Sequence, residues 1–199
     1  MPSYRLPCFI AGVCYLIFWY SYLIFLPVSL IASNYAGVVN SQGWFFVNVF
    51  QIFAIIAFVQ FYHSINSAIF NKGIFVKIMN IMQLIGFFCF MGIAFSETFV
   101  WPILAKASPN MLNVNTGEIF TNKVLMTFDI VSVLLFMTSN IFFGVKLRKY
   151  FPVMGVVFLV GMTLFCLGFA SGSIRYAVQT IGLTLFSFAF ISMGIKKHP

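Results

Sequence analysis

Charged residues are scarce in this chain of 199 residues. Asp, Glu, Lys and Arg together make up 7% of it, and hydrophobic residues make up 62%. Ordinary soluble domains carry about 25% charged residues. So few charges cannot cover a water-facing surface, which excludes a soluble globule. No hydrophilic insert is long enough to fold alone, so we predict a single integral membrane domain over residues 1–199.

Motifs for catalysis and metal binding are also missing. The sequence has no GxSxG, HExxH or Walker pattern and no paired acidic metal motif. The four cysteines form no CxxC pair and lie within or at the edges of apolar runs, as Cys8, Cys14, Cys89 and Cys166. We interpret them as small packing residues. The sequence therefore does not favour an enzyme, and we predict no cofactor and no metal site.

Long apolar runs dominate the chain. A helix needs about 20 mostly apolar residues to cross the hydrocarbon core of a bilayer. The first run carries Pro27, where we expect a kink. We predict an all-α polytopic bundle of six transmembrane helices, with spans at about residues 8–32, 44–63, 78–105, 124–145, 153–170 and 174–195.

The basic residues indicate an orientation. The net charge is +8, but the charges lie between apolar runs, which argues against a nucleic-acid partner. With six spans, one side would carry Arg5, Lys72, Lys77, Lys146, Arg148, Lys149, Lys196 and Lys197. The other side would carry Lys106, Lys123 and Arg175. Because cytoplasmic loops are enriched in Lys and Arg, this bias predicts that both termini are cytoplasmic.

Only two acidic residues fall inside the predicted spans, Glu97 and Asp129. Each is about five residues from the outer end of its span, or roughly 7–8 Å below the outer boundary. Arg175 begins the sixth span at the same outer end. Pro102 follows Glu97 and lacks an N–H, so we expect the helix ladder to open beside this acid. An ionisable residue inside a membrane is by default a candidate functional residue.

Polar residues recur on single faces of several predicted helices. A polar stripe should turn inward, because lipid offers no hydrogen-bond partner. The second span places Asn48 and Gln51 together. From the third, fourth and sixth spans we predict one polar cluster, made of Glu97, Asp129, Arg175, Gln83, Asn140 and Gln179, with Trp101 at its outer edge.

Two interpretations of this cluster are open. In one, Arg175 pairs with an acid as a structural lock; in the other, the two acids form a proton- or cation-responsive site. We predict a multi-pass protein of the plasma (inner) membrane that handles a small solute or ion, as a transporter, a channel or the membrane subunit of a transporter. The alternative is a non-catalytic membrane partner or sensor whose buried polar groups are structural. Its expected partners are the lipid bilayer and other membrane subunits, and the ligand is left open. A cavity at the level of Glu97 and Asp129 would separate the two functions.

Overall fold

The structure, a computed structural model, describes residues 4–69, 73–168, 171 and 174–195. Within these ranges the chain is helical and has no β-strand, so the prediction of an all-α protein is confirmed. The long helices are α1 (Arg5–Phe25), α3 (Gln42–Ile69), α4 (Ile74–Phe95), α7 (Lys123–Tyr150), α8 (Pro152–Gly168) and α9 (Arg175–Ile195). The shorter elements are η1 (Val28–Leu30), α2 (Tyr35–Val39), the π-helical segment η2 (Ser96–Val100), α5 (Trp101–Ala107), η3 (Pro109–Leu112) and α6 (Glu118–Thr121).

Among the described residues, five helical stretches are long and apolar enough to cross a membrane. They are α1, α3, the continuous stretch Ile74–Ala107, α7 and α9. The chain thus has the build of a polytopic membrane protein. Helix α8 has 17 residues, or roughly 26 Å, which is shorter than the hydrocarbon core. The sixth span and the orientation stay predictions, and Lys72, Lys196 and Lys197 lie outside the described residues.

Several predicted span boundaries differ from the structure, and the ends of α1 and α3 differ most. Helix α1 ends at Phe25 rather than near residue 32, because Leu26 is extended (φ −103°, ψ 138°) ahead of Pro27. A residue before proline is pushed out of the helical region, so the proline ends this helix instead of kinking it. Helix α3 continues to Ile69, beyond the predicted end at residue 63.

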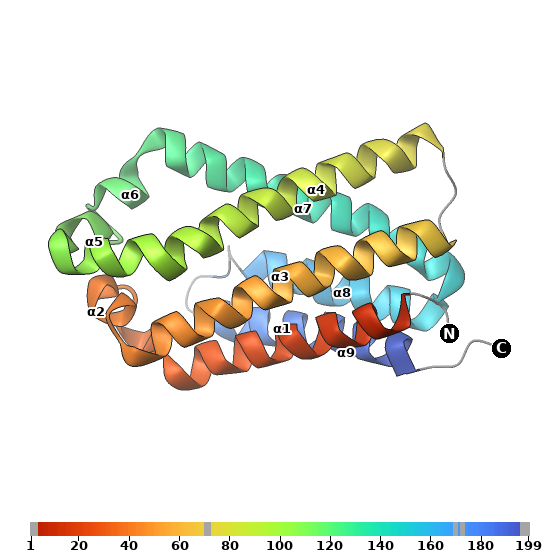
Figure 1. The fold of residues 1–199 in the computed structure, drawn as a ribbon, viewed down its shortest axis with the longest axis horizontal. Helices are drawn as coiled ribbons and strands as arrows, with labels where there is room; N and C mark the ends of the chain where they lie inside the picture. The colour runs from red at the N-terminus through yellow and green to blue at the C-terminus, as the bar shows by residue number, and fades with distance from the viewer. Residues whose placement is uncertain (1–3, 70–72, 169–170, 172–173, 196–199) are drawn as a thin grey trace.

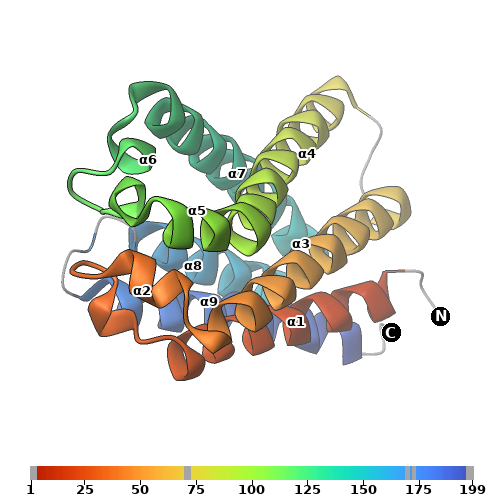
Figure 2. The same ribbon diagram turned by 60° about the vertical axis from the view of Figure 1, so that its left-hand side comes forward.

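The six long helices form a closed ring (Figures 1 and 2). Going around it, α1 contacts α3, α3 contacts α4, α4 contacts α7, α7 contacts α8, α8 contacts α9, and α9 contacts α1. Helix α1 begins and α9 ends at one end of the ring, which we call the terminal end. The Arg5 side chain joins them there by donating to the Gly194 carbonyl oxygen at 3.1 Å. The opposite end carries α2, α5 and α6, and we call it the capped end.

The two ends have separate hydrophobic cores. At the terminal end, buried aromatic rings from α3, α7, α8 and α9 fill the ring of helices. Phe190 is central there, with its ring centroid 4.6 Å from that of Phe61 and 5.4 Å from that of Phe158. At the capped end, a smaller core joins α2, α5 and η3 to the start of α3 and includes Val38, Trp44, Ala105 and Leu112. This cap covers the end of the bundle where the polar residues of interest lie.

Candidate functional site: a cavity with an acid and a base on opposite walls

The register of the helix changes next to Glu97. In segment η2 the Trp101 N–H donates to the Ser96 carbonyl oxygen, five residues back. In this register the Glu97 carbonyl would take its bond from residue 102, and Pro102 has no N–H to give. The Trp44 indole Nε1 donates to the Glu97 carbonyl oxygen instead, at 2.7 Å. The opening of the ladder predicted from Pro102 is therefore present, and a side chain of α3 satisfies the carbonyl that it frees.

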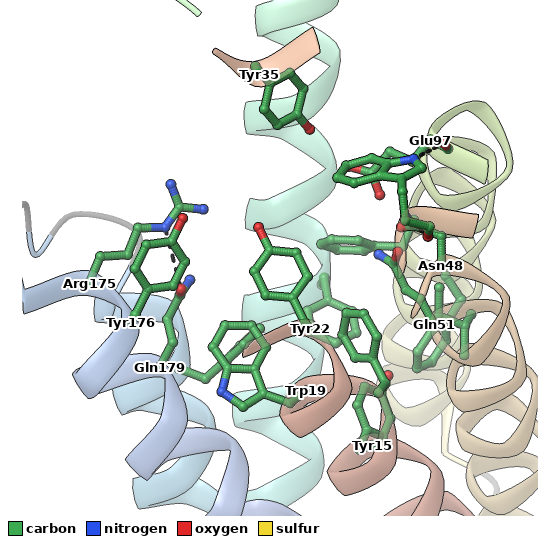
Figure 3. A pocket seen from close by; sticks show the side chains of 17 residues that line it. Tyr15, Trp19, Tyr22, Tyr35, Asn48, Gln51, Glu97, Arg175, Tyr176 and Gln179 are labelled. Atoms are coloured by element: carbon green, nitrogen blue, oxygen red, sulfur yellow. Dashed lines mark hydrogen bonds between the residues drawn. The ribbon is translucent and has the colours of Figure 1, made fainter. Parts of the chain in front are cut away.

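A cavity of about 170 Å³ lies beside this segment, in the capped half of the bundle. Its lining comes from α1, α2, α3, α4, η2, α7, α8 and α9, so it occupies the centre of the helix ring (Figure 3). Aromatic side chains make up most of its wall, and polar groups gather on two sides. A designed cavity of about 150 Å³ in another protein holds one benzene molecule, which sets the scale of an occupant here.

The first polar wall belongs to α3 and η2. Glu97, Trp44, Asn48 and Gln51 line the cavity here. Gln51 lies next to the Glu97 carboxyl group, and the Asn48 amide donates to the Trp44 carbonyl oxygen at 2.8 Å. The acid is thus held on a wall of hydrogen-bonding side chains and an indole ring.

The second polar wall belongs to α9, on the opposite side of the cavity from Glu97 (Figure 3). The Arg175 Nε atom donates to the Gln179 Oε1 atom at 3.4 Å, and its guanidinium carbon lies 5.8 Å from the centroid of the Tyr176 ring. Gln179 is fully buried, whereas Arg175 is exposed and still lines the cavity. The guanidinium therefore lies where the cavity meets the surface.

Aromatic residues of α1 and α2 connect the two polar walls. Tyr22 stacks on Trp19, with ring centroids 5.6 Å apart and planes 9° apart. Tyr22 and Tyr35 each lie within electrostatic range of both Glu97 and Arg175. In the cap, burial and the nearby Glu97 carboxylate raise the pKa of Tyr35 well above its ordinary value. The Tyr35 hydroxyl therefore keeps its proton at neutral pH and can donate a hydrogen bond into the cavity.

The predicted polar cluster separates into parts in the structure. Glu97, Arg175 and Gln179 all line the cavity, as the prediction of one shared site requires. Trp101 lies behind the acidic wall, where its ring stacks near Trp44 with centroids 6.4 Å apart. It supports the site without lining it.

Gln83 and Asn140 form a separate pair closer to the terminal end. Gln83 is fourteen residues before Glu97, or roughly 21 Å along the helix axis. Its Nε2 atom donates to the Asn140 Oδ1 atom at 3.1 Å, and the Asn140 amide donates to the Phe136 carbonyl oxygen at 2.8 Å. Both side chains are fully buried and join α4 to α7. This pair has the geometry of a structural lock.

Asp129 does not line the cavity. It lies in the first part of α7, where every residue from Lys123 to Val131 is exposed. Its charge is near enough to act on Glu97, but its side chain is on the surface of the bundle. The predicted group of two facing acids inside the protein is therefore corrected to one acid, Glu97, and one base, Arg175.

Sequence reasoning missed several lining residues. The polar face of Asn48 and Gln51 is expected from the sequence to turn inward with those of three other spans, but the predicted cluster does not include these two residues. Trp19 and Tyr22 look like packing residues in the sequence, because aromatic residues are abundant throughout the chain. The signal that could have found them is position, since all four lie in the half of their helix that leads to the cap.

Comparison with protein families, with curated proteins and with solved structures finds no match to this chain. Within the described residues, no group of three or more His, Cys, Asp or Glu side chains is placed to hold a metal ion. Its function is therefore inferred from the cavity and the residues around it.

Proposed function

We propose that this chain is a multi-pass membrane protein that binds a small polar solute in the cavity beside Glu97, and that it handles this solute as a transporter, a channel or the membrane subunit of a transporter. The observation that carries the proposal is the cavity itself, at the level of the acid. Protein interiors are close-packed, so a cavity of this size in the middle of a helix bundle departs from ordinary packing. A chain that used its polar groups only for packing would gain stability by filling this space.

The alternative function is that of a membrane partner that binds no solute, and it would explain the polar residues outside the cavity. The buried pair of Gln83 and Asn140 is what such a protein needs to fix its helices. It does not account for an acid and a base facing the same empty space. The plasma (inner) membrane stays our proposed location, since the distribution of basic residues follows the rule for cytoplasmic loops.

The test is a thermal-stability screen of the purified protein in detergent against a panel of small polar solutes. A solute that binds only the folded state raises the melting temperature by mass action. Ile55 lines the cavity and is 4% exposed, so Ile55→Phe should fill part of the space and abolish the shift. The matched control is Ile56→Phe, which places the same ring on an exposed side of α3 and should keep the shift.

Two results would contradict the proposal. In the first, no solute of the panel stabilises the wild-type protein. In the second, the solute that does so stabilises Ile55→Phe equally well, which would locate its binding outside the cavity.

A further inference from the structure

The cavity has an acidic side chain on one wall and a basic side chain on the opposite wall. Glu97 lines the wall made by α3 and η2, and Arg175 lines the wall made by α9 (Figure 3). Arg175 is held on its own wall by its contacts with Gln179 and Tyr176. The space between the two groups therefore has a basic side and an acidic side, and a cation bound next to Glu97 would favour the ionised form of that acid.

This charge arrangement disfavours simple ions. A small cation would meet the Arg175 guanidinium where the cavity opens to the surface, and like charges repel. A small anion would be attracted to Arg175 but would then face the Glu97 carboxylate. A molecule with a charge of each sign at its two ends meets neither obstacle. Each of its charged ends can pair with the side chain of opposite sign, which offsets the cost of taking that charge out of water.

The aromatic wall suits the positive end of such a molecule. Trp44 lies beside Glu97, and the stacked rings of Trp19 and Tyr22 follow along the cavity. Cations are attracted to the faces of Trp and Tyr rings, most strongly where water is excluded. An ammonium group near Glu97 would thus have a carboxylate and aromatic faces around it. A carboxylate at the other end would have the Arg175 guanidinium and the Tyr35 hydroxyl within the same cavity.

We propose, on the basis of the solute-binding function above, that the cavity takes a small zwitterion, with its ammonium end toward Glu97 and its carboxylate end toward Arg175. The cavity volume of about 170 Å³ limits the ligand to a compact molecule. By comparison with benzene in a cavity of about 150 Å³, the ligand has about six to eight non-hydrogen atoms. A short ω-amino acid has this size and carries its two charges at opposite ends.

The experiment measures the affinity of the purified wild-type protein for 4-aminobutanoate by isothermal titration calorimetry. Butanoate and n-butylammonium, which each keep one of the two charges, are the comparison probes. We expect 4-aminobutanoate, or the neighbouring ω-amino acid of best length, to bind about tenfold or more tighter than either single-charge probe. A series from glycine to 5-aminopentanoate, with the N-trimethylated forms, gives the preferred length and head group.

Variants then assign each end of the ligand. Glu97→Gln should lower the affinity for the zwitterion and for n-butylammonium by about tenfold or more, and it should leave the affinity for butanoate unchanged. Arg175→Gln should lower the affinity for the zwitterion and for butanoate by about threefold to tenfold. The effect is smaller because an exposed charge is partly screened by water. The matched control is Lys106→Gln, which removes an exposed charge from α5 outside the cavity lining and should leave all affinities unchanged.

The results that overturn this inference differ from those that overturn the proposed function. If n-butylammonium binds as tightly as every zwitterion, and Arg175→Gln changes no affinity, the cavity binds cations. The proposed solute-binding function would then stand, but the inference of a zwitterion would be wrong. If no member of the series binds the wild-type protein, the inference is also wrong. The screen with Ile55→Phe and Ile56→Phe then decides separately whether the cavity binds any solute.

Discussion

The terminal half and the capped half of the bundle are built from the same six long helices but are packed differently. In the terminal half, interlocking Phe rings leave no space around Phe190, which is fully buried. In the capped half the helices surround a cavity of about 170 Å³, and aromatic side chains make up most of its wall. Aromatic residues are therefore common to both halves. What distinguishes the capped half is the π-helical register at Ser96–Val100 and the polar side chains that face the cavity.

The polar groups of the two halves differ in the same way. Gln83 and Asn140 use one another as hydrogen-bond partners and are closed off from any ligand. Glu97 and Arg175 lie on opposite walls with the cavity between them. A polar pair that fixes helices and a polar pair that faces a ligand can therefore be told apart by what lies between their members. The following predictions test this difference.

The largest effect is expected from removing a ring in the terminal half. Phe190→Ala should lower the free energy of unfolding by about 3–5 kcal/mol, the usual loss for a buried Phe. Phe90 is its counterpart on the wall of the cavity, and Phe90→Ala should cost less, because that ring already borders an empty space. SDS titration of each variant in mixed micelles measures both values. Equal losses would show that the two halves are packed alike.

The close contact between α8 and α9 should make a glycine there sensitive to one added methyl group. A Cβ atom at Gly182 would contact the Phe165 backbone nitrogen and lie 2.6 Å from the Gly161 carbonyl oxygen. Gly182→Ala should therefore push α8 and α9 apart and cost about 1–3 kcal/mol. Gly92 is the control, since a Cβ atom there has nothing within 4 Å, and Gly92→Ala should gain about 0.5–1 kcal/mol from reduced chain entropy. Destabilisation of both variants to the same extent would contradict the contact.

The hydrogen bond between Gln83 of α4 and Asn140 of α7 should contribute less to the free energy of unfolding than the contacts above. Asn140→Leu leaves the buried Gln83 amide without its acceptor and should cost about 0.6 kcal/mol, and at most about 1.7 kcal/mol, as interhelical hydrogen bonds do in membranes. Gln83→Leu combined with Asn140→Leu removes both members and should recover part of that loss. A double-mutant cycle in the same unfolding assay measures the coupling. No coupling between the two positions would show that the pair is not a lock, and solute affinity should be unchanged in every variant.

Much of the fold could be predicted from the sequence, because apolar runs and prolines act locally. Hydropathy located the long helices, and Pro102 indicated where the helix ladder opens. The register that the chain adopts there was not predictable, because it depends on the Trp44 indole from another helix. Pro27 was interpreted as a kink, although the restriction that it places on Leu26 is equally compatible with the helix end that the structure has there.

The sequence predicts how deep the site residues lie along their helices, but it does not predict how each helix is rotated about its own axis. Counting residues from the span ends placed Glu97, Asp129 and Arg175 at one level, and two of them do line one cavity. The direction in which a helix presents its side chains depends on its neighbours. The side chains at the start of α7, from Lys123 to Val131, are all exposed, so Asp129 lies on the surface at the level where Glu97 lines the cavity. A prediction from depth alone therefore grouped Asp129 with Glu97 and Arg175, although the packing of the helices places Asp129 outside the cavity.

The smallest effect therefore belongs to Asp129 and is the most direct test of that separation. Asp129→Asn should change the free energy of unfolding by no more than about 0.5 kcal/mol, because the side chain is exposed and lines no cavity. If Asp129 instead formed a buried ionic group with Glu97 and Arg175, removing one member would cost about 3–5 kcal/mol. SDS titration distinguishes these values easily. Glu97→Leu is the comparison variant, because it removes the carboxyl group that lies next to Gln51. It should lower the free energy of unfolding by more than Asp129→Asn does, but by less than breaking a buried ion pair would. A loss of several kcal/mol in Asp129→Asn would restore the two-acid cluster that depth predicted and would remove the basis for separating the site from the surface of α7.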